Sequence, residues 1–269
     1  MNRLNRVFEA DDLPAGELPA LLTKIYDGGL AIRDGAVYAN FVSSIDGIAA
    51  LEGGTAASGG VISGRNESDR FVMGLLRAFA DAVLVGAGTV RAEGLRALWT
   101  PEFIFPVATE AFASLREGLK RNKTPRLVIV TARGELDPSH RALQEGALVL
   151  TTTAAASHLR RALPTATEVR AISQTAPIDI DEIFATLKAD GHRTILTEGG
   201  PQLFGELVAR NRVDELFLTV SPRLVGQPDR SYGIIRGVNF GRTFKGARLL
   251  SARRADSYLF LRYTLENAA

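Results

Sequence analysis

A glycine-glycine-proline turn separates an apolar run from a helix-like segment in the stretch ILTEGGPQLFGELVARN. Proline is favoured at the first position of a helix, because the N–H group that it lacks would have no acceptor within the helix. With Pro201 at that position, free N–H groups would cluster at the positive end of the helix dipole. They belong to Gly199, Gly200, Gln202 and Leu203. The turn therefore predicts an anion-binding site, and the absence of a Walker lysine favours a diphosphate that is held rather than transferred.

The acid directly before this turn needs an explanation of its own. Glu198 would face the same cleft, and a carboxylate beside a phosphate is costly unless it binds something else. It could accept hydrogen bonds from an amino-substituted ring, or it could complement the helix dipole as an acid at the start of a helix. The residues alone favour the second role.

A second glycine loop follows a strand-like run in DAVLVGAGTVRAEG. Gly86 and Gly88 would allow a cofactor to approach the backbone closely, and Thr89 would supply a hydroxyl group. A dinucleotide fingerprint needs a third glycine where Arg91 stands, and an acid at the end of the next strand. Because both are missing, a cofactor site and a plain strand-to-helix turn remain equally good interpretations.

The composition excludes several classes of site. The 269 residues include no cysteine and only three histidines, so disulfides, thiolate nucleophiles and cysteine-liganded metals are ruled out, and we expect no metal site. The first residues carry acids where a secretion signal needs an apolar segment, and no apolar run is long enough to cross a membrane. We expect a cytoplasmic protein that binds neither membrane nor nucleic acid, since basic residues form no cluster.

The elements that must position these residues alternate along the chain. Short apolar runs predict strands at 36–42, 81–86, 126–131, 147–153, 168–173 and 193–199. Helix-period segments lie between several of them, as at 66–80 and 177–191, which is typical of a mainly parallel sheet covered on both faces. The runs at 213–222, 247–255 and 257–265 follow one another without a clear helix, and the last two predict an antiparallel hairpin. We expect an α/β fold with a mixed sheet.

Four motifs occur in an order that resembles a known family. They are YANFVSSIDG, SGGVISG, LLRAFADAVLVGAGTVRAEG, and LTEGGPQLFGEL followed by VDELFLTVSP. Together they resemble the pyrimidine reductase family of riboflavin biosynthesis, the reductase domain of the bifunctional deaminase-reductase. The resemblance implies a reductase domain at 36–269 after an N-terminal extension at 1–35, with a three-layer α/β/α dihydrofolate-reductase-like fold and a homodimer. The chain resembles a stand-alone member, because no deaminase-like segment is found in it.

The resemblance also implies a reaction. Members of the family use NADPH to reduce 5-amino-6-(5-phosphoribosylamino)uracil, or its 2,5-diamino-pyrimidinone analogue, to the ribitylamino product. The cofactor supplies a hydride to C1′ of the ribose, while the protein supplies placement, a proton and exclusion of water. A site without cysteine and with few histidines would be sufficient for this chemistry.

By position in the motifs, the resemblance assigns an NADPH site to both glycine loops. The cofactor-binding residues that it implies are Val42, Gly86, Gly88, Thr89, Glu93, Gly199, Gly200, Pro201, Gln202 and Leu203. The 2′-phosphate that distinguishes NADPH from NADH needs a donor, and the strand-end loop TARGEL offers Thr131 or Arg133.

The substrate side of the resemblance is less complete. Glu198 and Arg77 match substrate-binding positions, which favours the ligand role for Glu198, and Asp46 could contact either ligand or cap the turn before Gly47. We expect Asp46 and Glu198 to be the catalytic residues. The family continues after the cofactor loop with an Asp-Asp-Pro turn and an arginine for the substrate phosphate, whereas this chain has EGLRALWTPEF. Arg96 is the only cation nearby.

Two alternatives remain at this stage. A dihydropterin or dihydrofolate-type reductase would pair a flat pteridine ring with Glu198 and need no phosphate anchor. A catalytically inactive regulatory protein would keep the NADPH half and turn over neither substrate. In each case the partner is a small molecule rather than a macromolecule.

Overall fold

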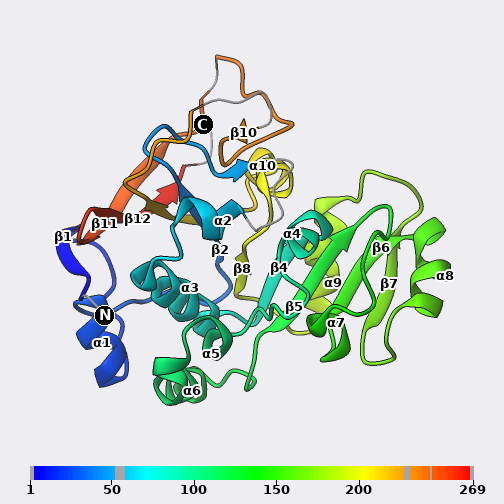
Figure 1. The fold of residues 1–269 in the computed structure, drawn as a ribbon, viewed down its shortest axis with the longest axis horizontal. Coiled ribbons are helices and arrows are strands. Elements are labelled where there is room, and N and C mark those ends of the chain that lie inside the picture. The colour runs from blue at the N-terminus through cyan, green and yellow to red at the C-terminus, as the bar shows by residue number, and fades with distance from the viewer. Residues whose placement is uncertain (1–2, 52–57, 227–230, 243, 267–269) are drawn as a thin grey trace.

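A computed structural model describes residues 3–51, 58–226, 231–242 and 244–266 of the chain (Figure 1). The strands are β1 (Asn5–Glu9), β2 (Val37–Ser43), β3 (Ala50–Leu51), β4 (Ala82–Gly86), β5 (Arg126–Thr131), β6 (Leu148–Thr152), β7 (Glu168–Ser173), β8 (Ile195–Thr197), β9 (Glu215–Val220), β10 (Ser231–Tyr232), β11 (Ala247–Ala255) and β12 (Tyr258–Leu265). The helices are α1 (Ala20–Tyr26), α2 (Ser58–Ile62), α3 (Glu67–Phe79), α4 (Ala87–Ala92), α5 (Pro101–Ile104), the 3-10 turn η1 (Pro106–Ala108), α6 (Thr109–Gly118), α7 (Arg141–Gln144), α8 (Thr153–Ala162), α9 (Ile180–Ala189) and α10 (Pro201–Ala209).

A mixed sheet of 10 strands runs through the molecule in the order β1-β11-β12-β9-β2-β8-β4-β5-β6-β7. The strands from β9 to β7 in this order are parallel to one another, whereas β12, β11 and β1 are added antiparallel at one edge. The predicted fold class is confirmed, including the C-terminal antiparallel hairpin, which is formed by β11 and β12.

Helices cover both faces of this sheet and enclose a separate apolar core on each face. In β4, Val83 and Val85 belong to one core, while Ala82 and Leu84 belong to the other, as the two-residue period of a strand requires. Side chains of α1, α3, α6 and α8 fill the first core, and those of α9 and α10 fill the second. In Figure 1, α3 and α6 lie below β2, and β7 and α8 lie at the right-hand end of the molecule.

The position of α3 matters most for the site. Its start is fixed by Asn66, whose side chain accepts hydrogen bonds from the N–H groups of Ser68 and Asp69 at 2.9 and 3.1 Å. Its end is fixed by buried Arg116, whose Nη1 donates to the carbonyl oxygens of Arg77, Ala78 and Ala80 at 3.1, 3.1 and 2.9 Å. Burial lowers the pKa of Arg116 to about 10. Both ends of the helix are therefore held by side chains.

The segment before residue 36 also contributes to the main sheet. β1 pairs with β11, and Leu4, Leu22 and Tyr26 are buried in the first core. Arg253 of β11 stacks on Tyr26, with its guanidinium carbon 3.8 Å from the ring centre. The domain boundary at residue 36 stays a prediction, and the first strand is integrated with the domain that it precedes.

Candidate active site

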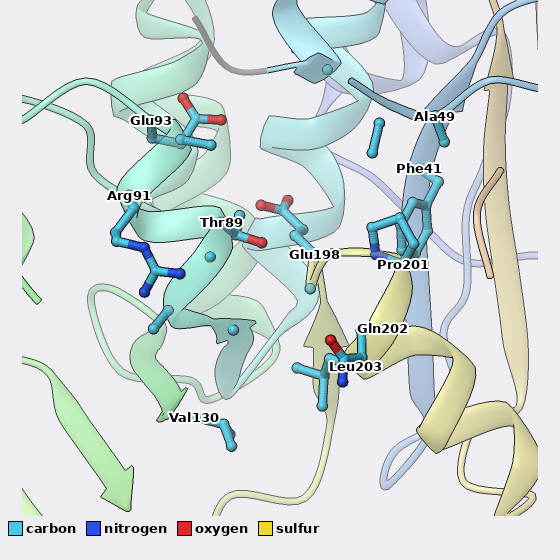
Figure 2. Close-up of a pocket in the computed structure, with 18 of the residues that line it drawn as sticks. Phe41, Ala49, Thr89, Arg91, Glu93, Val130, Glu198, Pro201, Gln202 and Leu203 are labelled. Atoms are coloured by element: carbon cyan, nitrogen blue, oxygen red, sulfur yellow. The ribbon is translucent and has the colours of Figure 1, made fainter. Parts of the chain in front are cut away.

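A cavity of about 1410 Å³ opens at the carboxyl ends of the parallel strands β2, β8, β4 and β5, between α3, α4 and α10. Ligands of open α/β sheets bind at this edge. Pockets for a single small ligand measure roughly 300–1,000 Å³, so this cavity has room for two ligands side by side. Figure 2 shows Thr89 and Arg91 of α4 and its C-cap Glu93 on one side, and Pro201, Gln202 and Leu203 of α10 on the other.

Most of the residues predicted from the sequence lie on the wall of this cavity. They are Val42, Arg77, Gly86, Gly88, Thr89, Glu93, Thr131, Arg133, Glu198, Gly199, Gly200, Pro201, Gln202 and Leu203. Asp46 and Arg96 are not among the residues that line it. The two glycine loops, which are separated by more than a hundred residues, meet because β4 and β8 are neighbours in the sheet.

The N-terminus of α10 has the form that the sequence predicts. The helix begins at Pro201, and Gly200 is its N-cap in an extended conformation without a side-chain cap. The N–H groups of Gln202 and Leu203 therefore point out of the first turn, where no carbonyl of the helix can accept them. Together with the helix dipole, they form an anion-binding position on the cavity wall.

A ligand can approach the backbone closely around this position. A Cβ atom on Gly200 would meet only the hydroxyl of Thr89, at 3.6 Å, so this glycine faces α4 across open space. Gly86 is the N-cap of α4 and also faces open space. One expected donor is already used, because the N–H of Gly199 donates to Oγ1 of Thr197 at 3.3 Å. The expectation of a free N–H at Gly199 is therefore corrected.

The loop after β5 forms another part of the wall. The hydroxyl of buried Thr131 accepts a hydrogen bond from the N–H of Gly134 at 3.0 Å, which holds the turn. Arg133 is exposed and lines the cavity. Arg91 of α4 also lines the cavity and forms an ion pair with Glu135 at 3.6 Å. Positive charge is thus available at this end of the cavity.

A buried ion pair joins the predicted substrate residues. Nη2 of Arg77 donates to Oε2 of Glu198 at 2.7 Å, and Nε donates to Oε1 at 3.0 Å. The side chains are 5% and 8% exposed. Nη1 of Arg77 donates to the carbonyl oxygen of Leu98 at 3.2 Å. A bidentate pair of this kind fixes both side chains in the cavity wall.

Two further carboxyl groups lie on the wall near this pair. Asp69 of α3 is 5% exposed, and burial raises its pKa to about 6, with the charge of Glu198 as a smaller cause. Burial also raises the pKa of Glu93, the C-cap of α4, an effect that the charge of Arg77 opposes. Glu93 was predicted from its motif, whereas Asp69 was missed. The signal that could have found it is its spacing of four and eight residues from Met73 and Arg77, which places all of them on one face of the helix.

Asp46 has a structural environment outside the cavity wall. It accepts hydrogen bonds from the hydroxyl of Ser44 at 2.5 Å and from the N–H groups of Val225 and Gly226 at 3.2 and 2.7 Å. These bonds, with Ser44 the largest cause, hold the pKa of Asp46 below its ordinary value. Asp46 therefore connects the loop after β2 to the loop after β9, in keeping with the turn-capping interpretation. Arg96 is exposed beyond the end of α4.

The described residues contain no helix long and apolar enough to cross a membrane. Within the same parts of the chain, no group of three or more histidine and acidic residues could hold a metal ion.

The fold and the cavity define an α/β protein with an anion-binding helix end and buried acids at one edge of a parallel sheet. Residues 36–251 match the model of the RibD C-terminal domain, so the chain belongs to the RibD C-terminal domain family. The resemblance seen in the motifs is confirmed.

Individual relatives agree with this assignment. The chain is 29% identical over 170 residues, 61% of this chain and 71% of the relative, to the 2,5-diamino-6-ribosylamino-4(3H)-pyrimidinone 5′-phosphate reductase of Archaeoglobus fulgidus. Its fold is similar to that of a pyrimidine reductase-like protein from Corynebacterium diphtheriae, with a TM-score of 0.70 at 22% identity over 86% of this chain and 92% of that chain. It is also similar to the riboflavin biosynthesis reductase of Saccharomyces cerevisiae, with a TM-score of 0.59 at 15% identity over 88% and 93% of the two chains.

Proposed function

We propose that this protein is an NADPH-dependent reductase of a ribosylaminopyrimidine phosphate in riboflavin biosynthesis. The substrate is 5-amino-6-(5-phosphoribosylamino)uracil or its 2,5-diamino-pyrimidinone analogue, and the product is the ribitylamino compound. One observation carries the proposal: a single large cavity joins an anion-binding helix end to a buried group of acids. The activity named for the relative from Archaeoglobus fulgidus supports it.

The residues of the cavity fit NADPH. The cofactor supplies a hydride when it is bound. The N–H groups at the start of α10 and the hydroxyl of Thr89 would hold its diphosphate, and Gly200 leaves the space that close approach requires. Arg133 would bind the 2′-phosphate, because it is the exposed cation at the end of β5.

The residues near α3 fit the pyrimidine. Glu198 is held by Arg77, and carboxylate lone pairs beyond those used in the pair can accept hydrogen bonds from ring amino groups. Since Arg96 does not line the cavity, the substrate phosphate needs other cations. Arg65 and Arg70 lie on the wall at the start of α3 and would serve this purpose.

The test is NADPH oxidation, followed by absorbance, with the ribosylaminopyrimidinone phosphate and with dihydrofolate in parallel. We expect turnover of the pyrimidine phosphate and much weaker turnover of dihydrofolate. Faster reduction of dihydrofolate would favour the pterin reductase, and NADPH binding without turnover of either compound would favour the regulatory protein. The proposal includes a cytoplasmic homodimer, and analytical ultracentrifugation measures its oligomeric state.

A further inference from the structure

Asp69 is an acid of the cavity wall that has no part in the ion pair between Arg77 and Glu198. Asp69 lies in the first turn of α3. Met73 and Arg77 follow it by about one and two helical turns, and the side chains of all three residues line the cavity. The wall thus presents a carboxyl group and a guanidinium group from a single rigid helix. The ends of that helix are fixed by Asn66 and Arg116.

The partners of Asp69 are neutral. The hydroxyl groups of Thr219 on β9 and Ser63 before α3 lower the pKa of its carboxyl group, and both of these residues are buried. Within the described parts of the chain, no arginine or lysine forms a salt bridge with Asp69, whereas Glu198 pairs with Arg77. Thr219 is opposite Val42 in the pairing of β9 with β2, so Asp69 lies over the strand ends that face the cavity.

We propose that Asp69 is the general acid that gives the substrate its proton during reduction. The inference rests on the proposed function, because it assigns the proton that must accompany the hydride. Glu198 and Glu93 are less suited to this step. Glu198 is held as a partner of buried Arg77, and Glu93 follows α4 on the cofactor side as its C-cap.

The step balances as follows for a ribosylamine. The bond between C1′ and the ring oxygen breaks, and its electron pair goes to the oxygen, which takes the proton of Asp69. The nitrogen lone pair forms a C=N bond to C1′. A hydride, which NADPH would supply when bound, would add to C1′ and return that pair to nitrogen, and the Asp69 carboxylate would regain a proton from water. One hydride and one proton are consumed in total.

The surroundings of Asp69 suit an acid that keeps its proton up to about pH 6. Burial is the main cause that raises its pKa, to about 6, and the Glu198 carboxylate, facing it from the end of β8, raises it further. The hydroxyls of Thr219 and Ser63 lower it. A catalytic acid works best with a pKa close to the operating pH.

The test compares Asp69→Asn with Glu67→Gln, an exposed carboxyl-to-amide change on the same helix outside the cavity. Asparagine keeps hydrogen-bonding capacity toward Thr219 and Ser63. We expect kcat/KM to fall by ~10²-fold in Asp69→Asn, with the Kd of NADPH, measured by fluorescence, unchanged within threefold. Glu67→Gln should behave like the wild type. Equal losses of activity and NADPH affinity would overturn the assignment.

The pH dependence supplies a second measurement. In the wild type, kcat/KM should be constant below pH ~6 and fall tenfold per pH unit above it, while Asp69→Asn should lack this decline. Carbon NMR of labelled aspartate, assigned with the same variant, should show the Asp69 carboxyl titrating near 6 without any ligand.

The possible failures can be distinguished. A carboxyl that titrates below 5, or a variant with wild-type activity, would overturn the role of Asp69 alone. A wild-type protein that reduces neither the pyrimidine phosphate nor dihydrofolate would overturn the proposed function and this role together.

Discussion

The two sides of the cavity present different chemical groups to a ligand. On the side of α4, α10 and the loop after β5, backbone N–H groups and glycines face the ligand space, as at Gly86 and Gly200, together with the exposed side chain of Arg133. On the side of α3, they are buried ionisable side chains, namely Asp69, Arg77 and Glu198. We call these the backbone wall and the carboxylate wall.

This difference between the two walls determines which properties of the site depend on pH. A helix N-terminus attracts an anion through fixed dipoles, which do not titrate. The carboxylate wall places an acid with a pKa of about 6 beside a charged pair, so its net charge changes with pH. We therefore expect pH to affect substrate chemistry far more than binding of the cofactor phosphates.

Removing the Glu198 carboxylate from the carboxylate wall should cause the largest loss of activity and stability. Glu198→Gln removes the charge that Arg77 needs and the acceptors proposed for the pyrimidine ring. We expect kcat/KM to fall by ~10²-fold or more. The free energy of unfolding should fall by roughly 3–5 kcal/mol, because one partner of a buried pair is left uncompensated. Steady-state kinetics and urea unfolding measure the two losses.

The matched control is Glu135→Gln. Glu135 pairs with Arg91 at 3.6 Å, but these side chains are 55% and 49% exposed. An exposed pair contributes ~0–1 kcal/mol, so this variant should be nearly as stable as the wild type. Equal destabilisation by the two changes would show that the burial of the Arg77 pair has no energetic consequence.

The backbone wall could be predicted because its signals are local. Proline fixes φ and glycine permits close approach to the backbone wherever they occur, so the start of α10 at Pro201 follows from a few adjacent residues. The longer parallel strands and the hairpin could be predicted for the same reason, since the apolar pattern of each is contained in its own sequence, whereas β1, β3 and β10 were not predicted.

The carboxylate wall could be predicted only in part, because its members meet through long-range packing. Arg77 and Glu198 could be found by resemblance, but their pairing depends on the position of α3 over the sheet. Asp69 depends on Thr219, which is distant in sequence, and a single acid in a helix start is read as a dipole partner. Asp46 shows the converse. Its position in a motif suggested a catalytic role, but its side chain accepts hydrogen bonds that hold two loops together.

The stability of the carboxylate wall should change with pH through Asp69. Its pKa is raised in the folded protein, so the folded state binds more protons than the unfolded state between about pH 4 and 6. The contribution of this group to stability is therefore complete at low pH and is lost as pH rises through its folded pKa. Asp69→Asn should gain stability relative to the wild type from pH 4 to pH 8, by up to ~3 kcal/mol.

Urea unfolding of both proteins across this range measures the gain. Taking the difference between them cancels the carboxyl groups with lowered pKa values, such as Asp27 and Asp137, which act in the opposite direction. A difference that is independent of pH would contradict a buried, titrating Asp69.

A methyl group added to the backbone wall should weaken the binding of NADPH without affecting the fold. In Gly200→Ala, the added methyl group has room beside Thr89 but occupies the space proposed for the diphosphate. We expect the Kd of NADPH to rise ~10-fold, while the Kd of the pyrimidine phosphate stays within twofold, as measured by calorimetry. Gly118→Ala, where a Cβ also meets open space but outside the cavity, is the control. A reversed pattern of affinities would place the pyrimidine at the start of α10.

The smallest effect should come from the exposed end of the backbone wall. Arg133 lines the cavity but is exposed, so water screens its attraction for a 2′-phosphate. Arg133→Ala should therefore raise the KM for NADPH only ~3- to 10-fold and leave the KM for NADH unchanged. High salt should reduce the difference between the wild type and the variant, because it weakens the same interaction. If the KM values for NADPH and NADH rise equally, the side chain of Arg133 stabilises the loop after β5 rather than binding a phosphate. The preference for one cofactor must then come from Arg91 on the facing helix.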